Sequence, residues 1–413
     1  MIARPRYLND LKQFQDKDLI KVLVGIRRCG KSSLLRLHRD QLLAQGVPDN
    51  RVIHLDFDIA EFSELQNAQQ LNVWLTQHMR EPGSYYVLLD EVQEIVGWEK
   101  VVNSLYAQKV ADIYITGSNA RVLSSELATY LTGRYVTVPV YPLSFEEYFA
   151  FNASHLIKDE ADVRANRTLL AAAFEDYRER GGFPVVYAGD FDVEQGNRIV
   201  LDVYNSILLR DIVQRHNVRN VDMLERVAQF VLGNVGNIFS GNKIADYFKS
   251  QRRATNPETV YNYLKILAEA YVIAKASRFD IEGKNILKTN EKFFAGDHSL
   301  VTAVLGYSAN RLPGVLENIV YLELRRRGWT TYVGKQGVRE IDFVAQRAGQ
   351  RIYVQVCSRL GSEETVQREF APLRALRDSY PKYVISLDAD APESVEGIMR
   401  MSIPEFLLRE DWA

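Results

Sequence analysis

The sequence predicts an α/β protein whose first part is built around a parallel β-sheet, and three segments carry that prediction. Residues 19–24 form a short apolar, β-branched run, and residues 31–42 follow it with the spacing of an amphipathic helix. Residues 85–91 form an apolar run that ends in two acids, as a central parallel strand covered on both faces would. Residues 111–119 form a third strand-like run that ends in small polar residues. Strands that alternate with helices favour a parallel sheet.

Composition narrows the class of protein without naming an activity. The 413 residues are 46% hydrophobic and 25% charged, which is typical of a globular chain of two to three domains. The net charge of -2 gives no overall attraction for nucleic acid, so a polyanion site would have to be local. Two cysteines exclude a disulfide scaffold, and no apolar run approaches the ~20 residues of a membrane span. We therefore expect a cytoplasmic protein without a structural metal.

A phosphate-binding loop lies between the first strand and the first helix. The segment matches the pattern G-x-x-x-x-G-K-[ST] in the strand–loop–helix setting that this pattern requires. The glycines let backbone amides turn inward around a phosphate, and the lysine supplies a point charge to the β- and γ-phosphates. The serine after the lysine is a Mg²⁺ ligand. The predicted nucleotide-binding residues are Gly25, Ile26, Arg27, Arg28, Cys29, Gly30, Lys31, Ser32 and Ser33.

The two acids that end the second apolar strand complete the predicted site. Parallel sheets bind ligands at the carboxyl ends of their strands, where Asp90 would hold the Mg²⁺ shell and Glu91 would polarise the attacking water. A simpler interpretation is that this Asp-Glu pair caps the next helix. The phosphate loop upstream favours the catalytic interpretation.

These segments resemble a known family. The order Gly-Ile-Arg-Arg-Cys-Gly-Lys-Ser-Ser, Leu-Leu-Asp-Glu-Val-Gln93, Ile-Thr-Gly-Ser-Asn119, Leu-Thr-Gly-Arg134 and Gly-Gly-Phe-Pro184 resembles prokaryotic AAA-superfamily ATPases that are fused to a C-terminal domain of unknown function. The resemblance spans nearly the whole chain. It implies ATP and Mg²⁺ as cofactors and ATP hydrolysis as the activity.

Two further positions are candidates for catalysis in such an ATPase. A polar residue after a strand inserted between the phosphate-loop strand and the acidic strand senses the γ-phosphate, which points to Ser118 or Asn119; capping of a helix that starts near Arg121 is an equally simple account. Arg134 follows a glycine and could neutralise transition-state charge, either in its own subunit or across the interface of a homo-oligomer. A surface arginine is the plain alternative.

Beyond the first domain, the pattern changes to helices and then to a hairpin. Residues 165–215 are expected to form helices broken at Gly181-Gly182, and three further helices are expected at 221–235, 241–250 and 257–270. Thr255-Asn-Pro-Glu258 has the capping-box pattern at the start of the last one, and residues 271–276 and 284–288 then form a hairpin. This order suggests a winged helix, which could contact DNA or serve protein contact instead.

The last segment is similar to the PD-(D/E)xK nuclease core. A helix from Leu316 and strands at 330–333, 340–345 and 351–357 follow the order of that core, and Glu317 and Asp342 match its first two acidic positions. In active nucleases of this type, a Glu-x-Lys on the next strand completes a magnesium site. This chain has Gln355 and Cys357 there, so we expect a degenerate centre without nuclease activity.

Together, these patterns predict four domains and a nucleotide-driven switch. The domains are an ATPase domain at 1–145, a helical connector at 146–220, a winged-helix domain at 221–300 and a nuclease-like domain at 301–413. The leading hypothesis is that ATP binding repositions the C-terminal modules, with DNA or a protein as partner and with no membrane. The alternatives are an ATP-powered nuclease and a regulatory protein that binds ATP with little turnover.

Overall fold

The computed structural model describes residues 2–117, 131, 133–152, 167–253, 255–388 and 394–412, without the side chains of 167 and 288–290. The chain divides into two compact units. Unit 1 comprises Met1–Pro142 with Glu269–Tyr271, and unit 2 comprises Leu143–Ala268 with Val272–Ala413. None of the described helices has the length and apolar character needed to cross a membrane.

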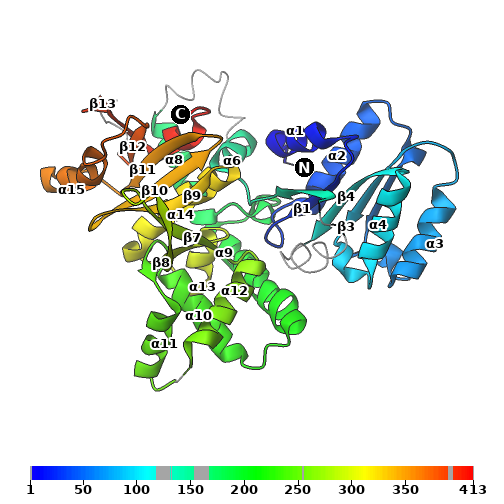
Figure 1. Cartoon of the computed structure of the whole chain (residues 1–413), viewed down its shortest axis with the longest axis horizontal. Coiled ribbons are helices and arrows are strands. Elements are labelled where there is room, and N and C mark those ends of the chain that lie inside the picture. The colour runs from blue at the N-terminus through cyan, green and yellow to red at the C-terminus, as the bar shows by residue number, and fades with distance from the viewer. Residues whose placement is uncertain are drawn as a thin grey trace. The chain divides into compact units, whose positions relative to one another are not determined.

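Unit 1 is a parallel five-stranded sheet with helices on both faces (Figure 1). The strand order is β2-β3-β4-β1-β5, so β4 lies between the phosphate-loop strand β1 and the acidic strand β3, as expected. All pairings in this sheet are parallel. The elements are α1 (Pro5–Phe14), β1 (Ile20–Val24), α2 (Lys31–Ala44), β2 (Val52–Asp56), α3 (Ala68–His78), β3 (Tyr85–Asp90), α4 (Trp98–Gln108), β4 (Ala111–Gly117) and β5 (Tyr135–Pro139).

The core of unit 1 explains why these segments become strands. On one face, alternate residues of β1 pack against apolar side chains of α3 and α4, with Trp98 among the largest fully buried groups. Helix α2 packs on β2, β3 and β4, and α1 lies beside α2. Because each central strand is covered on both faces, most of its residues are apolar, and the charged exceptions Lys21 of β1 and Asp112 of β4 pair with each other. Because β1, β4 and β3 run parallel, their carboxyl ends lie on the same side of the sheet. The phosphate loop after β1 and Asp90 at the end of β3 are therefore on that side.

Unit 2 begins with helices. The break at Gly181-Gly182 is confirmed, because α8 ends at Arg180. A positive φ of 82° suits Gly181, and a Cβ there would lie 2.3 Å from Ser299. Asp297 accepts a hydrogen bond from the Gly182 amide, so the glycines allow two chain segments to approach closely. The elements are α6 (Phe145–Asn152), α8 (Arg167–Arg180), α9 (Val193–Ser206), a π-helical continuation (Ile207–Gln214) and α13 (Ser299–Leu305).

Three helices and a hairpin follow, in the predicted order. They are α10 (Val221–Gly233), α11 (Gly241–Ser250) and α12 (Pro257–Glu269), then β7 (Ile273–Asp280) and β8 (Asn285–Ala295). The short strand β6 (Ile238–Phe239) pairs with β8. The residue that caps α12 is Asn256, whose side chain accepts from the Thr259 amide, rather than the predicted Thr255.

A nine-stranded mixed sheet runs through unit 2, in the order β13-β14-β12-β11-β10-β9-β7-β8-β6. Aromatic rings of α14 and the sheet stack on one face, with Tyr321 against Phe294, while Phe370 of α15 packs on the other face. The added elements are α14 (Leu312–Arg326), β9 (Thr330–Gln336), β10 (Arg339–Arg347), β11 (Gln350–Val356), α15 (Glu363–Arg374), β12 (Lys382–Ser386), β13 (Ser394–Val395), β14 (Ile398–Ser402) and α16 (Ile403–Leu408).

This sheet corrects the expected domain boundary at 300/301. Strand β7, from the predicted winged helix, pairs in parallel with β9, from the predicted nuclease-like part. Apart from Glu269–Tyr271, which belong to unit 1, residues 146–220, 221–300 and 301–413 therefore share one compact unit. The pairing joins segments about 50 residues apart, which local sequence patterns do not reveal.

Candidate functional site

The phosphate loop connects the carboxyl end of β1 to the start of α2. Gly25 has a φ of 155°, and a Cβ there would lie 2.0 Å from the Val140 carbonyl oxygen, so only glycine fits. Gly30 has a φ of 102° and forms the left-handed N-cap of α2. Within the loop, Ile26 and Cys29 are buried, while Arg28 is exposed with a positive φ of 67°. The sequence pattern and the backbone thus agree on a loop that wraps the helix N-terminus.

Buried cations hold this loop in place. The Lys31 side chain is 3% exposed and its ammonium donates to the carbonyls of Gly25 and Ile26, at 3.0 and 3.3 Å. The Arg4 guanidinium donates to the Cys29 carbonyl at 2.9 Å and to the Tyr141 carbonyl at 2.9 Å. Sequence analysis missed Arg4, because its role depends on contacts 25 and 137 residues away.

Asp90 ends β3 in full burial, beside two hydroxyl groups. The Thr116 hydroxyl donates to its Oδ1 atom, whereas its Oδ2 atom is buried without a direct hydrogen bond among the described residues. Burial raises the pKa of Asp90 to about 6, although the hydroxyls of Thr116 and Ser32 lower it. Because Oδ2 accepts no hydrogen bond of good geometry, it can bind a cation beside the Ser32 hydroxyl. Thr116 was not predicted, because it lies within the strand and the sequence pattern points to the polar residues that follow it.

Glu91 follows Asp90 in a left-handed conformation with a φ of 55°. Its amide donates to the Thr116 hydroxyl at 2.8 Å. Its carboxylate accepts a hydrogen bond from the Gln93 side chain, and Glu91 is 9% exposed. A non-glycine residue in this region costs of order 1–3 kcal/mol and often marks a functional site.

Arg134 lies immediately before β5, at the end of the sheet opposite to the phosphate loop. Its carbonyl accepts from the amide of Ile20, which begins β1, whereas the phosphate loop follows the end of β1. Its side chain is exposed and donates to Asn103 at 2.6 Å. The alternative that Arg134 acts in its own subunit therefore does not fit this geometry, because β1 separates it from Lys31. A role across a subunit interface stays a prediction. Ser118 and Asn119 lie outside the described residues.

A separate polar cluster lies within unit 2. The structure brings the predicted nuclease-like residues Glu317 and Asp342 together around Lys292, which sequence analysis missed. Glu340 joins them, 2.8 Å from the lysine. Burial raises the pKa of Glu317 to about 8 and that of Asp342 to about 6. A bulge in the β9–β10 ladder between Ile341 and Val344 contains Asp342, and bulges of this kind redirect side chains.

The other two nuclease-like positions have different partners. The Gln355 side chain accepts from the Asp342 amide at 3.3 Å and donates to Glu369 on α15 at 3.0 Å. Cys357 is buried in the apolar core against α15, and burial raises the pKa of its thiol to about 12. A thiol with this pKa is not a nucleophile at neutral pH.

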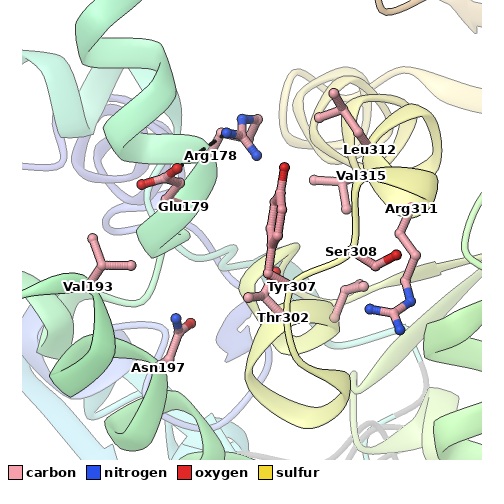
Figure 2. Close-up of a pocket in the computed structure, with 11 residues that line it drawn as sticks. Arg178, Glu179, Val193, Asn197, Thr302, Tyr307, Ser308, Arg311, Leu312 and Val315 are labelled. Carbon is pink, nitrogen blue, oxygen red and sulfur yellow. Dashed lines mark hydrogen bonds and ion pairs between the residues drawn. The ribbon is translucent and has the colours of Figure 1, made fainter.

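Unit 2 also has a pocket of about 170 Å³ between α8, α9, α13 and the start of α14. Figure 2 shows Tyr307 between Arg178 and Glu179 on one side and Leu312 and Val315 on the other. Arg178 pairs with Glu175 and Glu179, which offsets its charge. Arg311 also lines the pocket, so the lining combines two arginines with the acid Glu179.

The comparisons with known proteins agree with this geometry. Residues 17–149 match the family model described as AAA domain, and residues 171–311 match a domain of unknown function, DUF8612. An uncharacterized protein of Haemophilus influenzae is 37% identical over 412 residues, 99% of each chain. Uncharacterized protein MJ1544 of Methanocaldococcus jannaschii is 30% identical over 87% of this chain and 79% of its own.

The fold also resembles that of a solved ATPase structure. The Walker-type ATPase PABY2304 of Pyrococcus abyssi aligns with a TM-score of 0.50 at 17% identity, over 74% of this chain and 96% of that one. This likeness concerns the fold alone. The chain belongs to the same family as the Haemophilus and Methanocaldococcus proteins, and its first unit is an AAA-type P-loop domain followed by a domain of unknown function.

Proposed function

We propose that the chain binds ATP with Mg²⁺ and hydrolyses it. The observation that carries this proposal is Asp90, a buried carboxylate with an unpartnered oxygen at the same sheet edge as the phosphate loop. Ser32 and Asp90 would hold Mg²⁺, and the loop amides with Lys31 would hold the phosphates. A bound Mg²⁺ ion supplies charge neutralisation on the phosphates.

Glu91 would orient and polarise the water that attacks the γ-phosphate. Its carboxylate is the acid that follows Asp90, and the Thr116 hydroxyl contacts both residues. The Gln93 side chain donates to that carboxylate and holds it in place. Lys31, which donates to the carbonyls of Gly25 and Ile26, would exchange those bonds for charge-assisted bonds to phosphate oxygens.

Replacing Glu91 by glutamine tests the hydrolytic role. Loss of a positioned base lowers turnover by roughly 10²–10⁴-fold, and the proposal predicts this fall with ATP affinity retained. Turnover is measured by phosphate release, and affinity by calorimetry. Glu94→Gln is the matched control, because Glu94 is an exposed acid three residues further on. A Glu91→Gln rate equal to wild type would favour a protein that binds ATP without using this site for turnover.

The proposal extends to a switch in which nucleotide state changes unit 2. Hydrogen exchange of the full chain, with a nonhydrolysable ATP analogue and then with ADP, measures this directly. The proposal predicts different protection in residues 143–268 between the two nucleotides, and the same protection in Lys31→Ala with and without nucleotide. Equal protection in both nucleotide states of the wild type would contradict the switch while leaving ATP hydrolysis intact.

DNA is the proposed partner of this switch, through the winged-helix arrangement of α10, α11, α12 and the β7–β8 hairpin. The local charge supports it only weakly, because Arg253 pairs with Asp222 while Arg252 and Lys265 are exposed. Hydrolysis rates with single-stranded DNA, duplex DNA and RNA test the choice. Stimulation by duplex DNA that is lost in Arg252→Ala supports it, and indifference to all three favours a protein partner.

A further inference from the structure

A buried lysine in unit 2 is surrounded by carboxylates from two other elements. Lys292, on β8, is 2% exposed. Its Nζ atom lies 2.9 Å from Glu317 Oε2 on α14, 2.8 Å from Glu340 Oε1 on β10 and 3.5 Å from Asp342 Oδ1, also on β10. Strands β7 and β9 lie between β8 and β10 in the sheet order. The ammonium therefore links elements that are not neighbours in the sheet.

The ammonium of this cluster has a carboxylate partner for each of its donors. An ammonium has three N–H donors, and three carboxylates face it. The remaining oxygen of Asp342, Oδ2, accepts from the Val356 amide at 2.9 Å. Among the residues that the structure describes, no buried side-chain nitrogen or oxygen of Lys292, Glu317, Glu340 or Asp342 lacks a hydrogen-bond partner. Asp90 Oδ2 in unit 1 differs in this respect.

The charges support the same assignment. Burial alone would lower the pKa of Lys292, but the carboxylates of Glu317, Asp342 and Glu340 raise it above its usual value. The lysine is therefore a fixed positive charge at neutral pH. A buried cation that is paired and hydrogen-bonded in this way resists exchange, because its removal would leave uncompensated carboxylates.

We propose that the Lys292 ammonium takes the place of a divalent cation in this cluster, so that unit 2 carries its own counter-ion and binds no metal there. Mg²⁺ and Ca²⁺ bind oxygen ligands at roughly 2.0–2.6 Å from the ion. The ammonium occupies the point where the three carboxylates meet, so a metal would have to displace it. Without that metal, the cluster clamps β8 to α14 and β10 and does not cleave phosphodiesters.

The test compares the amount of Mn²⁺ that the wild type and its variants bind, each as the full chain without nucleotide. Mn²⁺ can reach the cluster, because Glu317 borders a pocket of about 230 Å³ lined by Gly236 and Gly314. Free Mn²⁺ is measured by electron paramagnetic resonance after equilibrium dialysis. Wild type and Asp342→Asn should bind the same amount. Lys292→Met should bind an additional Mn²⁺ ion, and this ion should be lost in Lys292→Met with Asp342→Asn.

The control is Lys275→Met, an exposed lysine on β7 that pairs with Glu291, which should bind Mn²⁺ as the wild type does. Lower binding in Asp342→Asn than in wild type would overturn the proposal, since it would place a metal in the natural cluster. Lys292→Met that folds, as circular dichroism reports, and binds no additional ion would overturn it as well. If Lys292→Met does not fold, the comparison of wild type with Asp342→Asn still decides.

DNA cleavage provides a second measurement. The proposal predicts no cleavage of plasmid DNA by the wild type with Mg²⁺ or Mn²⁺, and the same result for Asp342→Asn. Cleavage by the wild type that Asp342→Asn abolishes would contradict it. Both measurements use nucleotide-free protein, so they stand or fall separately from the proposed ATP hydrolysis.

Discussion

The two units each bury a group of carboxylates, and they treat it in opposite ways. In unit 1, Asp90 keeps an oxygen without a direct hydrogen bond next to Ser32, at the end of a strand and beside a phosphate loop. In unit 2, the carboxylates of Glu317, Glu340 and Asp342 enclose the ammonium of Lys292. A buried polar group that lacks a partner is costly and calls for a ligand, whereas one with an internal counter-ion does not.

This contrast separates a site that can bind from a site that holds the fold together. Raised carboxylate pKa values occur in both, so the pKa alone does not distinguish them. The distinction comes from counting partners, because Asp90 Oδ2 is buried without a hydrogen bond, whereas no buried oxygen of the Lys292 cluster lacks a partner among the described residues. Substitutions that remove one partner from each group should therefore have different consequences for stability and binding.

The largest expected effect is on stability, in Lys292→Met. Removing one member of a buried ion cluster costs about 3–5 kcal/mol, because the remaining charges stay buried without compensation. Urea unfolding monitored by circular dichroism measures the loss in the free energy of unfolding. Lys275→Met should cost less than about 1 kcal/mol, since exposed pairs contribute little. Equal losses in the two variants would show that Lys292 is not a clamp.

The next effect concerns ATP affinity in Lys31→Ala. Charge-assisted hydrogen bonds contribute about 1.5–3 kcal/mol each, so the dissociation constant for ATP should rise roughly 10–100-fold. Calorimetric titration gives this constant. Some stability should also be lost, because the lysine donates to the buried carbonyls of Gly25 and Ile26. Unchanged affinity would remove the assignment of the phosphate loop.

Lys21→Met is the matched control for that substitution. Lys21 is also a buried lysine in unit 1, but it pairs with Asp112 within the sheet. It should lose stability, because Asp112 would stay buried without its partner, and keep its ATP affinity in the folded fraction. The two lysines thus separate ligand binding from folding within one unit.

The smallest expected effect is a pH dependence of Mg²⁺ binding. Burial raises the pKa of Asp90 to about 6, so the protonated form, which does not bind a cation, gains population as pH falls. Between pH 7.5 and 5.5 the charged fraction falls about fourfold, and Mg²⁺-dependent ATP affinity should weaken by the same factor. The same measurement on Asp90→Asn gives the pH dependence that comes from the protonation of ATP itself. An identical pH profile in both proteins would exclude Asp90 as the group that titrates.

The sequence predicted unit 1 well because its signals are local. The phosphate loop spans eight residues, and the apolar strands around it are continuous, so spacing alone identifies them. The end of the sheet at which Arg134 lies could not be predicted. The Gly-Arg pair in the sequence does not show whether the arginine precedes a strand or follows one. Thr116 lies within a strand, and its contact with Asp90 becomes visible only when β4 is placed beside β3.

Unit 2 was harder to predict because its important contacts are distant in sequence. Glu317 and Asp342 were identified from a family pattern, but Lys292 lies 25 residues before the first and on another strand. The bulge in β10 that contains Asp342 leaves no clear sequence signal. The pairing of β7 with β9 is equally non-local, which is why one sheet was divided between two predicted domains.

The most direct test of this contrast is the number of Mn²⁺ ions bound per chain at saturating nonhydrolysable ATP analogue. The account predicts a single ion per bound nucleotide, weakened by Asp90→Asn and unchanged by Asp342→Asn. A second ion that disappears in Asp342→Asn would contradict the internal counter-ion in unit 2. If the wild type bound the nucleotide analogue without binding any Mn²⁺, the assignment of Asp90 as a metal ligand in unit 1 would be wrong.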